Sequence, residues 1–207
     1  MEDKSLKSKL WEELKKDGDE IIKLTSELIK IPSVNPPGDV SEIAVFIREY
    51  LEDAGAKIEI YESEKNRINI VSRIGSKTGK ELVFNGHMDV VPVGETSRWS
   101  FPPFSGEVKD GYILGRGASD MKGGLAGIIY AFKKLIDLED SLNGTLTLAI
   151  VPDEETGGQY GTGYLLDEGI VVGTSVVIAE PTCVDMVDIG QKGINWAKVR
   201  VYGKPTH

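Results

Sequence analysis

The pattern of apolar and polar residues predicts helices at the start of the chain. Apolar side chains follow helical spacing through residues 1–30, with Gly18 as an expected break, until a proline-rich stretch ends the pattern. A second helix is predicted over residues 40–54, with Asp39 or Ser41 as its N-terminal cap. The chain should therefore begin with helices on both sides of the proline-rich stretch.

Beyond this point the period changes to the alternation typical of β-strands. Strands are expected at residues 57–61, 67–74, 81–85, 145–151 and 175–179, with a β-hairpin at residues 107–114. Helices are expected between them, at residues 121–138 and 164–168. Helices that alternate with strands pack on both faces of a sheet, so this order predicts an α/β fold. We expect a three-layer α/β/α arrangement around a mostly parallel sheet.

A domain boundary is predicted near the end of the sequence. A short polar and glycine-containing stretch at residues 188–193 precedes a further strand expected at residues 194–202. We therefore expect one domain at residues 1–190 and the beginning of a second domain at residues 191–207.

The composition is that of a soluble globular protein and limits its classes of partner. Of the 207 residues, 40% are apolar and 28% are charged, and the net charge is −9. The absence of a run dense in lysine and arginine argues against a nucleic-acid partner. No apolar stretch resembles a signal peptide or a membrane span, so we expect a cytoplasmic protein without a membrane partner. The single cysteine, Cys183, agrees with a reducing compartment, and we interpret it as a buried small hydrophobic residue.

Acidic and imidazole side chains gather in four short segments that follow apolar strands or tight glycine turns. These segments are residues 86–89, 115–120, 153–155 and 179–182. Ligands of an open α/β sheet bind outside the carboxyl ends of its strands, so three of the segments should converge on one crevice. The pattern does not place the remaining segment, which delivers Asp120.

The group of carboxylates predicts a divalent metal ion. Several carboxylates in one crevice repel one another, and these segments contain no comparable cluster of lysine and arginine. One histidine with several carboxylates suits zinc, cobalt or manganese better than magnesium. The absence of thiolates in the segments excludes a structural zinc site of the cysteine type.

Two pairs of side chains carry most of this prediction. We interpret His87 as a metal ligand and Asp89, two residues later, as the group that orients it. Glu154 and Glu155 are adjacent, so in an extended backbone one would bind metal while the other faces the substrate. A structural histidine and a solvated acidic pair are the ordinary alternatives. The position of both pairs after apolar strands and beside glycine turns favours the metal site.

An ordered set of motifs resembles one family of enzymes. The set is NGHMDVVPVG, W-SFPPF, GRGASDMKGG, VPDEETGG, AEPT and a final GKPTH. In this order the motifs resemble the co-catalytic zinc deacylases and peptidases, a family that includes succinyl-diaminopimelate desuccinylase, acetylornithine deacetylase, aminoacylase and glutamate carboxypeptidase. The resemblance spans nearly all of the chain from about residue 20.

The resemblance implies a role for each candidate residue and two bound divalent ions, with zinc expected and cobalt or manganese as alternatives. His87, Asp120 and Glu180 would bind the first ion, and Asp120 and Glu155 the second, so that Asp120 bridges both. The other roles are assigned to Glu154 as general base, to Asp89 as the residue that holds His87, and to His207 as an oxyanion donor to a partner subunit's site. The resemblance also implies a cis peptide between Asp120 and Met121.

The resemblance further implies hydrolysis of an amide bond in an N-succinyl or N-acetyl amino acid, or a short peptide, by a homodimer. Dipeptidase, aminopeptidase or carboxypeptidase activity at the same site and a non-catalytic metal-binding module are the alternatives. The family pattern requires one more histidine, far downstream, for the second metal ion. We therefore expect a truncated catalytic domain, ending at the start of an inserted α+β dimerisation domain, that binds the second ion weakly and has little activity alone.

Overall fold

The structure is a computed structural model, and it describes most of the chain. The described residues are 2–76, 79–183, 185–190, 193, 197 and 199–204, with the backbone alone described for residues 2–6. His207 and part of the strand expected at residues 194–202 lie outside the described residues. Within the described part, no helix has the length and apolar character needed to cross a membrane.

The helices form where the apolar periodicity predicts them. They are α1 (Glu2–Lys16), α2 (Gly18–Lys30), α3 (Ser41–Glu52), α4 (Lys122–Ile136) and α5 (Tyr164–Asp167). Four short helical turns accompany them: η1 (Thr96–Arg98), η2 (Glu139–Ser141), η3 (Glu154–Thr156) and η4 (Gln159–Gly163). The break between α1 and α2 falls beside Gly18 as expected. The predicted N-cap of α3 is wrong, because Val40 occupies the N-cap position and makes no side-chain capping bond. The carboxylate of Asp39, one residue earlier, instead accepts the backbone N–H of Ser41, the first residue of α3, at 3.0 Å.

The strands confirm the predicted α/β sheet. They are β1 (Ile58–Glu64), β2 (Arg67–Gly75), β3 (Lys80–His87), β6 (Gly144–Val151) and β7 (Ser175–Ile178), and their order in the sheet is β1-β2-β6-β3-β7. The β3–β6 and β3–β7 pairs are parallel, whereas β1–β2 and β2–β6 are antiparallel. Only β2 therefore runs against the other four strands. The predicted hairpin is β4 (Glu107–Lys109) with β5 (Tyr112–Leu114), and Asp110 and Gly111 between them have positive φ angles.

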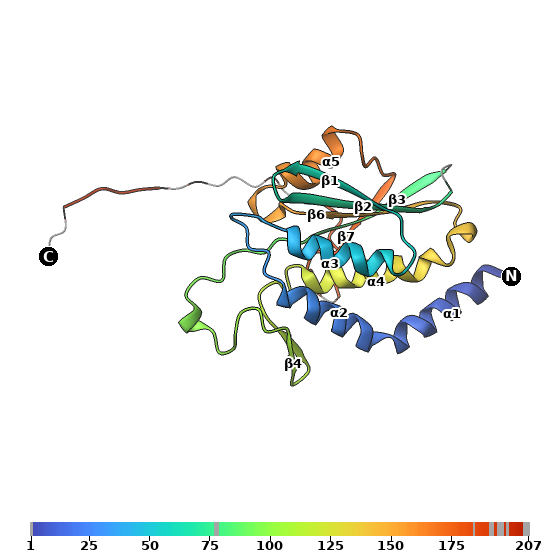
Figure 1. Cartoon of the computed structure of the whole chain (residues 1–207), viewed down its shortest axis with the longest axis horizontal. Coiled ribbons are helices and arrows are strands. Elements are labelled where there is room, and N and C mark those ends of the chain that lie inside the picture. The colour runs from blue at the N-terminus through green and yellow to red at the C-terminus, as the bar shows by residue number, and fades with distance from the viewer. Residues whose placement is uncertain are drawn as a thin grey trace.

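Helices cover both faces of the sheet. Figure 1 shows α2, α3 and α4 on one side of the sheet and α5 on the other. The larger core lies under α2, α3 and α4, where Leu28, Ile47 and Phe132 are fully or almost fully buried. The smaller core joins Leu165 of α5 and Val171 to the opposite face. The result is the three-layer arrangement expected from the sequence.

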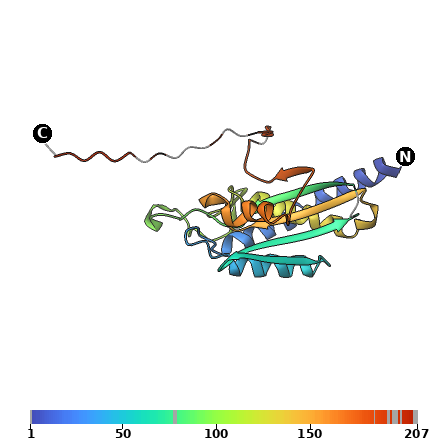
Figure 2. The ribbon, with the colours of Figure 1, turned by 90° about the horizontal axis from the view of Figure 1, so that it is seen from above.

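One sequence-based expectation is wrong for the residues after β7. Figures 1 and 2 show the described residues after Ile178 leading away from the sheet. Of the strand expected at residues 194–202, the described residues 199–202 are not in a strand, and the expected second domain stays a prediction. Cys183 is exposed rather than buried, because it lies where the chain has already left the sheet.

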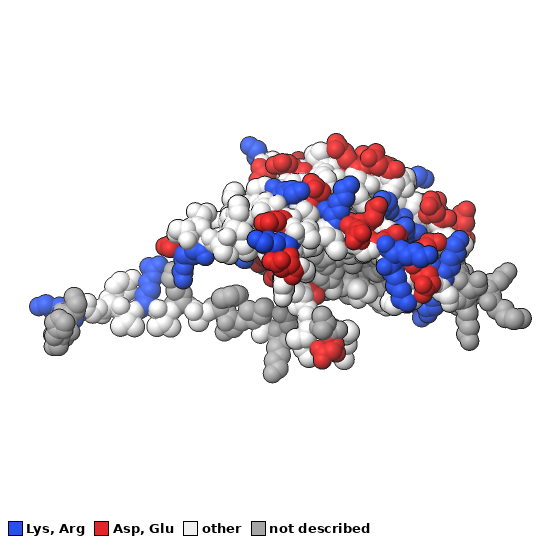
Figure 3. All heavy atoms as spheres, turned by 90° about the horizontal axis from the view of Figure 1, so that it is seen from below, with Lys and Arg blue, Asp and Glu red and all other residues white. Residues whose placement is uncertain are grey.

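The surface carries both signs of charge. Figure 3 shows lysine and arginine side chains interspersed with aspartate and glutamate side chains on the face viewed from below. Oppositely charged neighbours also occur along one helix: Glu27 and Lys30 of α2 form an ion pair at 2.7 Å. Such exposed pairs contribute little to stability. Among the described residues drawn on this face, positive charge is therefore not gathered into one tract.

Candidate metal centre

Three of the four predicted segments meet at the carboxyl ends of the parallel strands. His87, the last residue of β3, pairs in register with Val151, the last residue of β6. The turn after β6 carries Glu154 and Glu155, and Glu180 follows β7, the other neighbour of β3. The strand-end rule therefore places these side chains together as expected.

The turn before α4 brings Asp120 to the same place through contacts that the sequence pattern did not indicate. Met121 is fully buried, and its sulfur accepts the backbone N–H of His87 at 3.1 Å. Lys122 is also fully buried, and its ammonium donates to the carbonyl oxygens of Leu28 and Ile31, at 2.9 and 2.8 Å, at the end of α2. Asp120 is thus held in place by the burial of the two residues that follow it, Met121 and Lys122. The predicted cis peptide between Asp120 and Met121 is confirmed.

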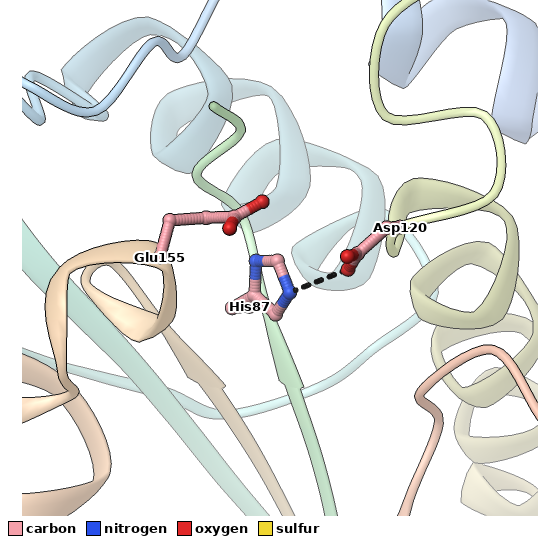
Figure 4. A group of neighbouring side chains, drawn as sticks. All are labelled: His87, Asp120 and Glu155. Atoms are coloured by element: carbon pink, nitrogen blue, oxygen red, sulfur yellow. Dashed lines mark hydrogen bonds and ion pairs between the residues drawn. The ribbon is translucent and has the colours of Figure 1, made fainter. Parts of the chain in front are cut away.

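The side chains surround the imidazole of His87. The Nε2 atom of His87 lies 3.2 Å from Asp120 Oδ1, 3.4 Å from Glu180 Oε1 and 3.9 Å from Glu154 Oε2. Figure 4 shows His87, Asp120 and Glu155 around a common space, entering it from β3, from the turn before α4 and from the turn after β6. A cavity of about 190 Å³ adjoins Asp120 and Glu155 and is also lined by Val91 and Arg116.

The electrostatics of the cluster are those of crowded carboxylates. Burial and the neighbouring Asp120 raise the pKa of Glu155 to about 7. Burial also raises the pKa of Asp120, with a further contribution from the charge of Glu180. The pKa of Glu154 is raised by burial and by the same acidic neighbours, which outweigh the opposing effect of His87. Burial disfavours the imidazolium of His87, but Asp89 and Glu180 outweigh burial and raise its pKa to about 11.

The donor set fits a divalent metal ion. Donor atoms lie within 4.8 Å of one another in two groups, His87 with Asp120 and Glu155, and His87 with Glu154 and Glu180. Among the described residues, no lysine or arginine forms an ion pair with these four carboxylates. Imidazole nitrogen with carboxylate oxygen is a ligand set that suits zinc, cobalt or manganese. A bound cation would relieve the repulsion that raises the pKa values of the acids.

Asp89 contacts both His87 and the acidic turn. It is fully buried; the Nδ1 atom of His87 lies 2.9 Å from its backbone oxygen and 3.4 Å from its carboxylate. The carboxylate also accepts the backbone N–H groups of Glu154 and Glu155, at 3.1 and 3.2 Å. Burial opposes ionisation of Asp89, but hydrogen bonds from His87 and Asn35 outweigh it and lower its pKa. Asp89 therefore lies where it can orient His87, and it also holds a second segment of the site.

The extended backbone assumed for Glu154 and Glu155 is not present. The two residues begin the 3₁₀ turn η3 rather than continue the extended backbone of β6. Asp89 binds both of their consecutive N–H groups, which favours this turn. Both side chains consequently reach the cluster around His87.

Four residues near the site were given no role of their own in the sequence analysis, although Asp153 lies in a segment that it singled out. They are Asn35, Arg67, Lys122 and Asp153, and all four are buried or nearly buried. Lys122 lies within the motif GRGASDMKGG and Asp153 directly precedes the two glutamates, so their positions in the sequence could have indicated a place near the site. The positions of Asn35 and Arg67 could not, because each reaches the site from a segment distant in sequence.

Comparisons with known proteins agree with the geometry. Residues 83–202 match the model described as peptidase family M20/M25/M40. A succinyl-diaminopimelate desuccinylase from Methylorubrum populi is 37% identical over 196 residues, which cover 89% of this chain and 50% of that protein. An N-formyl-4-amino-5-aminomethyl-2-methylpyrimidine deformylase from Halalkalibacterium halodurans is 35% identical over 170 residues, which cover 77% of this chain and 40% of that protein.

A solved structure is similar over the same part of the chain. The crystal structure of an M20 family metallo-carboxypeptidase from Sulfolobus solfataricus matches with a TM-score of 0.67 and 30% sequence identity. The match covers 77% of this chain and 37% of that one. The chain spans about half the length of the curated relatives it matches.

Proposed function

This chain belongs to peptidase family M20/M25/M40, and from that premise we propose that it supplies the metal-binding site of a hydrolase that cleaves an amide bond in N-acyl amino acids. The observation that carries the proposal is the convergence of one imidazole and four carboxylates, from four segments, on the space beside His87. Among the described residues, no lysine or arginine forms an ion pair with these carboxylates, and a divalent cation would compensate them.

We assign two divalent ions, zinc foremost, to this site. The first would be held by His87, Asp120 and Glu180, and the second by Asp120 and Glu155. The distances from His87 Nε2 to Asp120 and Glu180, 3.2 and 3.4 Å, support the first set. When bound, such ions polarise a substrate carbonyl and lower the pKa of water.

Glu154 is the general base in this proposal. Its side chain is 55% exposed, so it can reach an incoming substrate, while its carboxylate lies 3.9 Å from His87 Nε2. Its raised pKa favours a group that both accepts and returns a proton. Glu154 takes the proton of the attacking water and delivers it to the leaving amine nitrogen. His87, Asp120 and Asp89 orient the site and take no proton in these steps.

The substrate class is an acylated amino acid of small size. Relatives at 37% and 35% identity are named for removal of a succinyl and a formyl group, so deacylation is shared while the acyl group differs. Peptide hydrolysis is the second candidate, because the structural match at 30% identity is to a metallo-carboxypeptidase.

We further propose that the whole protein is a cytoplasmic homodimer. The oxyanion role of His207 stays a prediction.

Substrate panels and one substitution test this function. Hydrolysis of N-succinyl, N-acetyl and N-formyl amino acids and of unblocked dipeptides would be measured with the complete protein, loaded with zinc or cobalt. Glu154→Gln keeps the size of the side chain and removes the base, so kcat should fall by about 10²–10⁴-fold while metal binding is retained. The exposed Glu168→Gln serves as the control. Retained turnover in Glu154→Gln would exclude Glu154 as the base, and metal binding without hydrolysis of any substrate would refute the enzymatic function.

A further inference from the structure

Asp153 is a buried acid that the metal centre does not use. It is 2% exposed and directly precedes Glu154. One carboxylate oxygen accepts hydrogen bonds from Arg67 at 2.7 Å, from Asn35 at 3.2 Å and from Thr156 at 2.5 Å. The other accepts the backbone N–H of Tyr160 at 3.1 Å. Its charge is therefore compensated by the guanidinium of Arg67, which leaves it no need of a metal ion.

Asn35 links this acid to Asp89. The same amide nitrogen that donates to Asp153 also donates to the carboxylate of Asp89 at 2.8 Å. Asp89 in turn accepts the backbone N–H groups of Glu154 and Glu155. The turn that carries the two glutamates is thus fixed at its start by Asp153 and along its backbone by Asp89, and Asn35 couples the two anchors.

Arg67 is itself held in place from several directions. It begins β2, and its side chain is 12% exposed. Its second guanidinium nitrogen donates to the backbone oxygen of Pro37 at 2.9 Å, and the group lies over the ring of Tyr160 at 5.4 Å. A Cβ atom at Gly38 would collide with the guanidinium, so only a glycine at this position leaves room for the Arg67 side chain. The guanidinium is therefore enclosed by neighbouring residues rather than lying on the surface.

We propose that Arg67, acting through Asp153, is a positioning residue that sets the direction of the Glu154–Glu155 turn and thereby the metal affinity of the site. The proposal deepens the function given above and rests on it for the identity of the metal centre. Without the guanidinium, Asp153 loses the hydrogen bond and the charged partner that tie the start of the turn to β2. The turn can then shift, and metal ligands tolerate displacements of only about 0.5 Å.

The test compares two arginines of the same strand. Arg67→Met removes the proposed positioning residue, Arg67→Lys keeps its charge, and Arg73→Met is the matched control. Arg73 also lies on β2 and forms an ion pair with Glu59 at 2.5 Å, but it contacts none of the site residues. Each variant would be examined by circular dichroism, thermal unfolding, calorimetric titration with zinc, visible absorption of the cobalt-loaded protein, and kcat and KM on the best amide substrate.

Arg67→Met should weaken zinc affinity by about tenfold or more, change the cobalt spectrum, and lower kcat more than it raises KM. Arg67→Lys should restore part of the affinity, because an ammonium replaces the charge but not both hydrogen bonds. Arg73→Met should keep zinc affinity within about twofold even if it unfolds at a lower temperature. If Arg67→Met fails to fold, Arg67→Lys and Asp153→Asn carry the test, and both should weaken zinc binding.

The outcomes separate this inference from the proposed function. Zinc affinity and cobalt spectra that are unchanged in the Arg67 variants would overturn the positioning role, even if the variants are less stable. A protein that binds zinc but hydrolyses no amide would refute the proposed function, while the metal readouts would still decide the role of Arg67. A wild-type protein that binds no divalent metal would overturn both.

Discussion

Replacing Gly124 with alanine tests whether α4 determines where Glu180 lies. Gly124 is near the start of α4, and a Cβ atom there would collide with the backbone oxygen of Ala179. That oxygen belongs to the residue before Glu180, and Ala179 is itself bound through its N–H to the carbonyl of Asn85 at 3.2 Å. Because the obstacle is backbone rather than a flexible side chain, either α4 or the segment leading to Glu180 has to move.

The expected magnitude follows from two opposing effects. Alanine in a helix interior is favoured over glycine by about 0.5–1 kcal/mol. Overpacking against a fixed neighbour costs about 1–3 kcal/mol. Gly124→Ala should therefore lower the free energy of unfolding by up to roughly 2.5 kcal/mol, which corresponds to a fall in Tm of up to roughly 10 °C at this chain length.

Gly127 provides the control within the same helix. An added Cβ atom at Gly127 meets nothing within 4 Å, so Gly127→Ala gains the helix propensity without the collision. Its Tm should rise by roughly 1–4 °C. Thermal unfolding and calorimetric zinc titration of both variants check the reasoning, and only Gly124→Ala should also weaken zinc binding. If both substitutions raise Tm and bind zinc equally well, the close approach of α4 to Ala179 does not place Glu180.

Three other substitutions or conditions address the rest of the site. Asp120→Ala should lose more zinc affinity than Glu180→Ala, because a bridging ligand is removed from two ions rather than one; equal losses in calorimetry would exclude the bridge. Lys122→Met should lower the free energy of unfolding by about 1–3 kcal/mol, because two buried carbonyl oxygens at the end of α2 lose their donor; an unchanged urea midpoint would contradict this. Zinc affinity should fall as the pH drops, because His87, whose pKa is raised to about 11, must release a proton before it binds metal. Below about pH 7 the fall should become steeper, by up to roughly a further tenfold per pH unit, because Glu155, whose pKa is raised to about 7, must then also release a proton. Titrations from pH 6 to 8 that show no change of slope near pH 7 would argue against Glu155 as a ligand.

The sequence predicted those parts of the site that depend on periodicity and strand ends. His87 and Glu180 were placed together because each follows a strand of the parallel part of the sheet, and parallel strands end at a common edge. The helices and the hairpin were predicted from spacing and turn residues alone, since these signals are local. A metal ion was predicted because the segments carry several carboxylates without a comparable cluster of lysine and arginine, and this can be read from the sequence alone.

The remaining parts depend on contacts between segments far apart in the sequence. The position of Asp120 is fixed by Met121 and Lys122 packing against β3 and the end of α2, and no periodic pattern reports such a contact. The turn formed by Glu154 and Glu155 was not predicted, because Asp89, from another strand end, binds their N–H groups and favours a turned backbone. The local sequence pattern does not predict a contact between side chains and backbone groups of segments that are far apart in the sequence.

The strand order also has a consequence for how the chain folds during its synthesis. β2 and β3 follow one another along the chain, but β6 lies between them in the sheet. As the polypeptide emerges from the ribosome, β1 and β2 can pair as a hairpin at once. β3 cannot pair with β6 until β6 has been synthesised. During that interval the edge of β2 is open to β3 or to a second nascent chain. Rapid synthesis through residues 88–151, or a chaperone that shields the β2 edge until β6 arrives, should therefore increase the yield of correctly folded protein.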